Sequence, residues 1–304
     1  MIIKGYDAGV LAKKTFSEVW KDNVLGLSAQ AAYSFFFSLF PILLFLAPLF
    51  SLIGNKQVLV SRLLSRLSVT LPAEAYALLS GIVKDVVFSK NAPGLISIGI
   101  VLAIFSGSAV VDTLMGALNA AYNANNPRPW WKKRLIAFAF TIGSGIVVGV
   151  STLVFVGGQS MIDFVARFAH IPGDTKKFWT IAQYPLALVL ITGMIWLLFY
   201  LLPYVKQQKL HVLAGSIVTV ILWIGITMIF RWYVTNFGSY NKTYGTIGGV
   251  IILLTWMYLT MFAFLIGGEL ASELHVGTGR VGAPVAKLPS EALRDAAIAE
   301  KARF

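Results

Sequence analysis

Long apolar segments alternate with short polar ones along the chain. A helix that crosses about 30 Å of hydrocarbon needs about 20 mostly apolar residues, because lipid offers no hydrogen-bond partner to an open backbone amide. The apolar runs lack the apolar–polar alternation of membrane β-barrel strands. The pattern therefore predicts an all-α, polytopic membrane bundle of six transmembrane helices, at about 31–53, 95–118, 135–156, 178–202, 212–230 and 247–268.

The composition supports this interpretation and removes other classes of protein. Hydrophobic residues make up 57% of the 304 residues and charged residues only 12%, and the mean hydropathy is +0.77. Soluble domains carry about a quarter of their residues as charges, so a water-soluble fold would expose wide apolar patches. The absence of cysteine excludes a disulfide framework, a zinc–thiolate site and a cysteine nucleophile.

Lysine and arginine predict the orientation of the chain. The net charge is +12, which we interpret as loops held on the cytoplasmic side rather than as a nucleic-acid footprint. Of the 25 Lys and Arg residues, 15 flank the side that holds the N-terminus, the second and fourth loops and the C-terminal tail. The second loop carries Arg128, Lys132, Lys133 and Arg134 without an acid. We expect both termini to be cytoplasmic.

Three segments outside the spans complete the predicted organisation. Residues 1–28 predict a cytoplasmic interfacial helix, residues 29–274 hold the six-span domain, and residues 275–304 predict a mobile cytoplasmic tail. The first outer loop contains two amphipathic stripes, one through Leu63 and one after Pro72, which predict interfacial helices. These helices either rest on the membrane, the favoured interpretation, or form a gate over an outward-facing cavity.

Asp112 lies inside the second apolar run. An ionisable residue inside a membrane span is a functional hypothesis by default. As a carboxylate it would bind a cation or transfer a proton, and as a neutral or paired acid it would hold helices together. The sequence leaves both alternatives open.

Further polar residues are predicted near the cytoplasmic ends of the spans. Glu269 ends the sixth span, and Asn119 follows the second and is expected to cap that helix or bond its neighbour. The first span begins with polar side chains. We expect these residues to line a substrate or ion pathway at the inner mouth of the bundle, the full set being Asp112, Asn119, Glu269, Gln30, Tyr33 and Ser34.

Two further features concern shape and the outer surface. Pro41 and Pro48 fall inside the first span, where each removes a backbone hydrogen bond, so we expect a kinked first helix. The segment between the last two spans could receive an anionic headgroup or be an interfacial loop anchored by aromatic residues. Its headgroup candidates are Arg231, Tyr240, Lys242 and Tyr244.

The sequence contains no recognisable catalytic or metal-binding constellation. The only histidines are His170, His211 and His275, which lie outside the predicted spans and far apart. No HExxH, P-loop or GxSxG motif is present. We therefore assign no catalytic residue, metal or cofactor, and regard enzymatic activity as unsupported.

An ordered set of motifs resembles the YihY/BrkB family of bacterial inner-membrane proteins, some members of which were formerly labelled ribonuclease BN. The resemblance runs from about Leu27 to Leu274. It rests on Ala31-Ala-Tyr-Ser-Phe-Phe-Phe-Ser-Leu-Phe-Pro41, Ala117-Leu-Asn-Ala-Ala-Tyr122, Arg128 with Trp131-Lys-Lys-Arg134, Tyr200-Leu-Leu-Pro203, Ala214-Gly215, Tyr244-Gly-Thr-Ile-Gly-Gly-Val-Ile251, Trp256-Met-Tyr258 and Gly267-Gly-Glu-Leu270.

The resemblance implies six spans in the bacterial inner membrane. Family labels include a virulence factor, a tRNA-processing ribonuclease and lipid or lipopolysaccharide export. A ribonuclease needs an acid, a base or a metal cluster on a water-exposed surface, and the short inner loops offer none, so this activity is the least favoured.

The leading hypothesis is a protein that translocates an amphiphilic substrate, such as an anionic lipid or a lipopolysaccharide precursor. The alternative is a non-catalytic scaffold for the cell envelope. The expected partners are membrane lipids and no specific nucleic acid. A second copy or an envelope protein is left open as a further partner.

Overall fold

Helices make up almost all of the described structure. The computed structural model describes residues 2–3, 6–53, 56–70, 73–88, 92–124, 128–146, 175–237 and 240–279. Residues 130–146 are helical, and two short strands, β1 (Ile2–Ile3) and β2 (Tyr6–Asp7), pair antiparallel near the N-terminus. The labelled helices are α1 (Ala8–Lys21), α2 (Val24–Ile53), α3 (Lys56–Thr70), α4 (Ala73–Val87), α5 (Ala92–Ala121), α7 (Thr175–Leu201), α8 (Lys209–Phe237) and α9 (Tyr240–Gly279).

Three helices in the described part of the chain are long and apolar enough to cross a membrane. They are Val101–Ala121 in α5, Lys209–Asn236 in α8 and Ile247–Val276 in α9. Shorter apolar stretches lie at Val24–Leu39 and Pro185–Leu201. The predicted membrane helices are thus confirmed in three places, whereas the total of six spans stays a prediction.

The helices extend beyond most of the predicted span boundaries, and two features of them bear on the predictions. α9 continues to Gly279, so the helix includes the first residues that the sequence pattern assigned to the tail; residues 280–304 lie outside the described part. α2 is helical through both Pro41 and Pro48, without a break at either position. The predicted kink of this helix stays a prediction.

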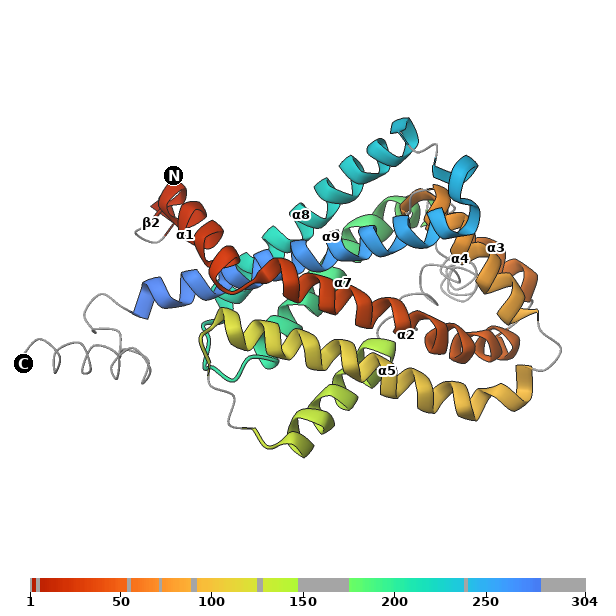
Figure 1. The fold of residues 1–304 in the computed structure, drawn as a ribbon, viewed down its shortest axis with the longest axis horizontal. Coiled ribbons are helices and arrows are strands. Elements are labelled where there is room, and N and C mark those ends of the chain that lie inside the picture. The colour runs from red at the N-terminus through yellow and green to blue at the C-terminus, as the bar shows by residue number, and fades with distance from the viewer. Residues whose placement is uncertain are drawn as a thin grey trace, which may run out of the picture.

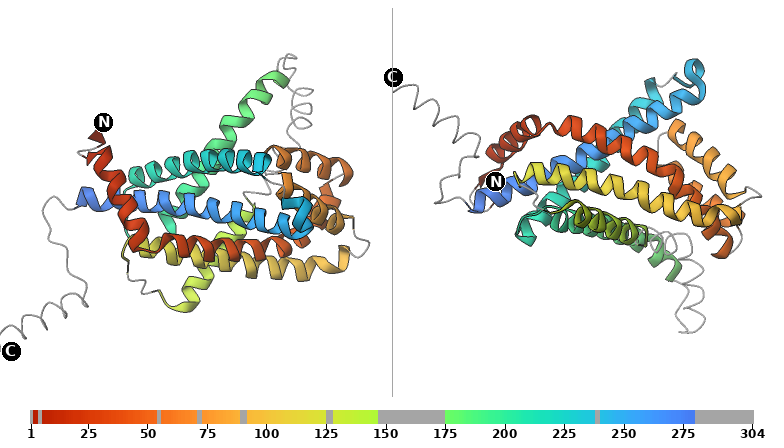
Figure 2. Two further views of the ribbon diagram at one scale, coloured as in Figure 1. Left: turned by 45° about the horizontal axis from the view of Figure 1, so that its top comes forward. Right: turned by 60° about the horizontal axis from the view of Figure 1, so that its bottom comes forward.

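The bundle is built around α9, which packs against α2, α5 and α8. α2 also lies along α5, and α7 packs on α8, as the two views of Figure 2 show. Large apolar side chains fill the interior, among them Leu118, Phe199 and Met257, which are almost completely buried. Others remain exposed, such as Phe105, Ile221 and Ile229, as expected for helices that face lipid.

The two amphipathic helices predicted in the first outer loop are present as α3 and α4. α4 packs against α9 and α2, and its apolar face buries Ala75 and Val83. In Figure 1, α3 and α4 lie at one end of the bundle, and the N-terminus, α1 and the last turns of α9 lie at the other. α4 therefore covers one end of the bundle.

A sharp turn between α1 and α2 brings α1 against α9. Asn23 has a φ of 52°, in the left-handed region, which Asn tolerates better than most residues. Its backbone N–H donates to the carbonyl of Trp20, and its own carbonyl accepts from Leu27 N–H at 3.0 Å. The turn thus ends one helix and begins the next, and it determines where Asp22 lies.

Candidate functional site

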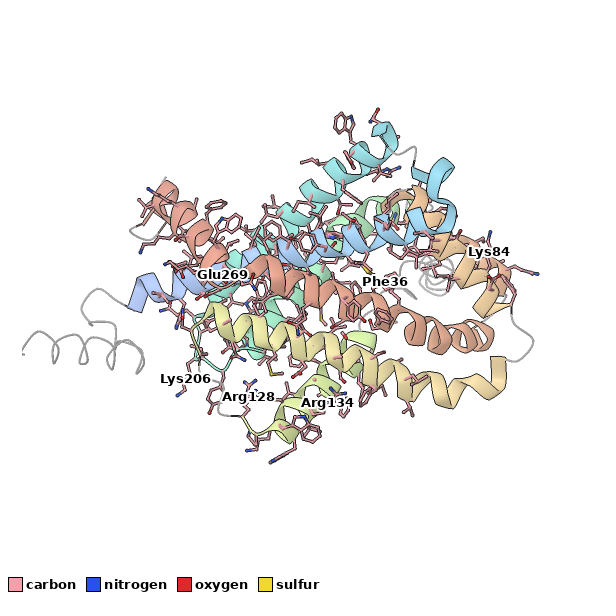
Figure 3. All side chains as sticks on the ribbon, in the orientation of Figure 1. Phe36, Lys84, Arg128, Arg134, Lys206 and Glu269 are labelled. Carbon is pink, nitrogen blue, oxygen red and sulfur yellow. The ribbon has the colours of Figure 1, made fainter. Side chains whose placement is uncertain are left out.

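Glu269 occupies the interior of the bundle at the end where α1 lies (Figure 3). Only 2% of the residue is exposed. It follows two glycines, and successive residues of a helix point about 100° apart. The three residues therefore face three different neighbours of α9.

Each glycine allows a close helix contact that positions Glu269. A Cβ on Gly267 would lie 2.7 Å from the carbonyl oxygen of Gly215, so the α8 and α9 backbones nearly touch. A Cβ on Gly268 would lie 2.7 Å from Leu118 of α5. Because α9 packs against α8 at Gly267 and against α5 at Gly268, Glu269 faces the α1–α2 turn.

The carboxyl group of Glu269 lies within hydrogen-bonding reach of that of Asp22, in this turn. Glu269 Oε2 and Asp22 Oδ2 are buried and have no hydrogen-bond partner among the described residues. Burial, followed by the charge of Glu18, raises the pKa of Asp22. We call Asp22 and Glu269 the carboxyl pair.

Two further carboxylates act on the carboxyl pair, Glu18 of α1 and Glu273 of α9. Glu18 forms an ion pair with Lys21 on the surface of α1. The hydrogen bond and charge of Glu18 raise the pKa of Lys21. The environment of the pair is thus mainly acidic, which favours a protonated carboxyl over two ionised ones.

A tyrosine hydroxyl lies in the same region. Tyr122 directly follows α5 and is 8% exposed, and its Oη has no hydrogen-bond partner within the described residues. Burial, followed by the charge of Glu269, raises the pKa of Tyr122. Its ring centroid lies 6.1 Å from that of His275, and Ser272 Oγ donates to the carbonyl of Ala121 at 2.7 Å.

Asn119 forms hydrogen bonds at the end of α5. Its Nδ2 donates to the carbonyl of Met115, and its Oδ1 accepts from the backbone N–H of Tyr204, each at 2.8 Å. Arg128 supports the same junction, since its Nη1 donates to the carbonyl of Leu202 at 2.9 Å. These contacts join the end of α5 to the segment that follows α7.

The other residues predicted for the inner mouth lie elsewhere. Asp112 is exposed on α5, and its charge is not among those that act on Glu269. Gln30 is exposed, Tyr33 is 59% exposed and lies against Phe37, and Ser34 is half-buried. The shared pathway of these residues stays a prediction.

The outer headgroup candidates are only partly visible. Arg231 is exposed near the end of α8. The backbone of Tyr240, Lys242 and Tyr244 belongs to α9, but their side chains lie outside the described residues. Their predicted role is therefore not tested.

Sequence reasoning found Glu269 but missed Glu18, Asp22, Glu273 and Tyr122. One signal was available, because acids are scarce, with 13 Asp and Glu in the chain. Glu18 and Asp22 are four residues apart, as are Glu269 and Glu273, so each pair shares one helical face. That the two faces meet is visible only in the structure.

A second feature is an open groove of about 610 Å³ between α7 and α8. Trp196 Nε1 donates to the carbonyl of Lys209 at 3.1 Å and so joins α7 to α8, and its ring stacks on Tyr200. Lys209 is the one charged residue of the lining. The lining consists of Leu188, Val189, Thr192, Gly193, Trp196, Lys209, Leu210 and Leu213.

The described residues contain no group of three or more His, Cys, Asp and Glu side chains that could hold a metal ion. Chemically, the carboxyl pair offers hydrogen bonding and proton binding. The groove offers an apolar surface with one cation. These properties suit the handling of a proton and of an amphiphile.

Several known proteins are similar in sequence to this chain. A ribonuclease-like protein of Bacillus subtilis, YfkH, is 29% identical over 266 residues, which cover 86% of this chain and 94% of that protein. UPF0761 membrane proteins of Aromatoleum aromaticum and Tolumonas auensis are 27% and 28% identical over 62% of this chain.

The matches span 44% and 60% of those two UPF0761 proteins, less than two thirds of their lengths. No solved structure matches this chain. The family described as Virulence factor BrkB matches residues 15–287, which include the carboxyl pair and the groove. The chain therefore belongs to the BrkB family of membrane proteins, which confirms the resemblance found in its motifs.

Proposed function

We propose that this membrane protein translocates an anionic amphiphilic lipid, whose acyl chain lies in the groove between α7 and α8. The groove is the observation that carries the proposal. Its lining is almost wholly apolar apart from Lys209. An acyl chain would occupy the apolar part, and the ammonium group of Lys209 would attract an anionic headgroup.

The position of the basic residues supports this assignment. Arg128 and Lys206 lie toward the same end of the molecule as Glu269, and Lys84 lies toward the opposite end (Figure 3). Lys and Arg are enriched in cytoplasmic loops, so we place this end in the cytoplasm and the protein in the bacterial inner membrane. A lipid in the groove would then have its headgroup at the cytoplasmic surface.

The test measures translocation of fluorescent anionic and zwitterionic lipids in proteoliposomes, with empty vesicles for comparison. Gly193 lines the groove, and a Cβ at this position meets no described atom within 4 Å. Gly193→Trp should fill part of the groove and reduce anionic lipid movement at least several-fold. Gly225→Trp is the matched control, since Gly225 is equally open and lies outside the groove lining.

The outcomes separate the function classes. Wild type faster than empty vesicles, with loss in Gly193→Trp alone, supports translocation through the groove. Equal rates for wild type and empty vesicles reject lipid translocation and favour the envelope scaffold. Asp112→Asn, assayed with and without a pH gradient, tests whether this exposed carboxylate belongs to an ion pathway.

A further inference from the structure

We propose that Asp22 and Glu269 form a proton-binding site, in which one proton shared by the two carboxyl groups joins the α1–α2 turn to α9. The site does not depend on lipid translocation. It concerns a pair of residues that the translocation proposal does not use. The ligand is a proton, and the alternatives are two ionised carboxylates or a bound metal cation.

Geometry supports the shared proton. The two carboxyl groups lie within hydrogen-bonding reach of each other. Two ionised carboxylates in contact repel each other and can only accept hydrogen bonds, so a proton on one of them turns the repulsion into a hydrogen bond. The second oxygen of each group is buried without a partner in the described residues, and two buried charges would leave both oxygens desolvated.

The charges around the pair point the same way. From α1, Glu18 acts on both carboxyls, and the exposed Lys21 acts on Asp22 while bonding to Glu18. From α9, Glu273 acts on both. Among the described residues, Lys21 is the cation that acts on Asp22, and the charges that act on Glu269 are those of acids. A proton is therefore the charge that the pair lacks.

The remaining titratable neighbours are Tyr122, which follows α5, His211 of α8 and His275 near the end of α9. Tyr122 is 8% exposed, and its hydroxyl has no hydrogen-bond partner among the described atoms. The charge of Glu269 acts on this hydroxyl. His275 lies against the Tyr122 ring. His211 is buried one turn before Gly215, which contacts α9 at Ala271.

A metal cation is the weaker alternative. No cluster in the described part of the chain offers three or more carboxylate or imidazole ligands in metal-binding proximity. A proton needs only the pair itself. Two strongly interacting carboxyls titrate as a unit in two separate steps, so the pair should hold one proton across a wide range of pH.

The experiment is a pH titration of the full-length protein in detergent, followed by infrared difference spectroscopy in the carbonyl region of protonated carboxyl groups. Wild type should show a protonated-carboxyl band at neutral pH that disappears at alkaline pH. The band should be absent in Glu269→Gln and in Asp22→Asn. Asp85→Asn, an exposed acid on α4, is the control that should keep it.

Two results would overturn the proposal. One is a wild type without a protonated-carboxyl band at neutral pH, which requires no variant. The other is a band that persists in both Glu269→Gln and Asp22→Asn. Because the readout is proton binding, it is independent of whether lipid moves in the vesicle assay.

Discussion

At the residue scale, a few positions in this chain are determined by backbone geometry rather than by polarity. Asn23 is one, because its φ of 52° is costly for side chains other than Asn and Gly. Gly267 is another, because a Cβ there would clash with Thr219 Oγ1. Both residues position the carboxyl pair, although neither belongs to the proposed proton-binding site.

Replacing Asn23 with valine should destabilise the protein by about 1–2 kcal/mol, since a β-branched residue is strained in the left-handed region. Asn23→Gly should be close to wild type, because glycine adopts this conformation freely. Thermal unfolding in mild detergent measures the difference. Equal stability of the valine and glycine variants would show that the turn does not need a positive φ.

Gly267→Ala should destabilise the α8–α9 contact by about 1–3 kcal/mol, because the added methyl group forces two close helices apart. Gly145→Ala is the matched control, since a Cβ there meets no described atom within 4 Å, and alanine favours a helix by up to about 1 kcal/mol. Denaturation of both variants in the same detergent decides. A loss of stability in the control alone would contradict the close contact.

At the element scale, α1 is held on the bundle by its turn and by its contact with α9. Helix pairs in a membrane gain little from the hydrophobic effect and depend on close packing and hydrogen bonds. The contact between the carboxyl groups of Asp22 and Glu269 is of this kind. Its strength should follow the protonation of the carboxyl groups.

The pKa of Asp22 is raised in the folded protein, mainly by burial. A group with a raised folded pKa contributes stability that is complete below its unfolded pKa and is lost as pH rises through the folded pKa. The stability of wild type should therefore fall as pH rises above the ordinary range of an aspartate, and Asp22→Asn should flatten this dependence. Thermal unfolding across a pH series measures it.

Asp85→Asn provides the reference for this pH series, because Asp85 is exposed on α4. It should retain the wild-type slope. If Asp22→Asn and Asp85→Asn follow the same pH curve as wild type, Asp22 does not contribute to the dependence.

At the scale of the whole molecule, charge and apolar surface are unevenly distributed. α3 and α4 lie at one end, and Glu269 lies toward the other (Figures 1 and 3). Lys209, the first residue of α8, is the charged residue of the groove lining. A lipid in the groove would have its headgroup near this residue.

Lys209→Gln should reduce the preference for anionic over zwitterionic lipid, since a basic residue near the membrane surface contributes about 1 kcal/mol to the attraction of anionic lipid. That corresponds to a roughly five-fold change in the ratio of rates. Lys206→Gln is the control, because Lys206 is exposed and outside the lining. An unchanged ratio in Lys209→Gln, or an equal loss in both variants, would reject Lys209 as the headgroup contact.

Much of the fold could be predicted from local pattern. The apolar run around Leu118, the amphipathic stripe that buries Ala75 and Val83, and the start of α8 near Val212 all correspond to observed helices. Such features depend on residues close in sequence, which is why periodicity and spacing reveal them.

The sequence by itself determined that this is a helical membrane protein of the BrkB family, because apolar length and ordered motifs are properties of the chain alone. Only the tertiary structure decided which polar residues meet. Glu269 contacts Asp22 rather than Asp112 because Gly267 and Gly268 hold α9 against α8 and α5 and leave its next face to the α1–α2 turn. That choice depends on packing between residues far apart in sequence, which hydrophobic periodicity does not encode.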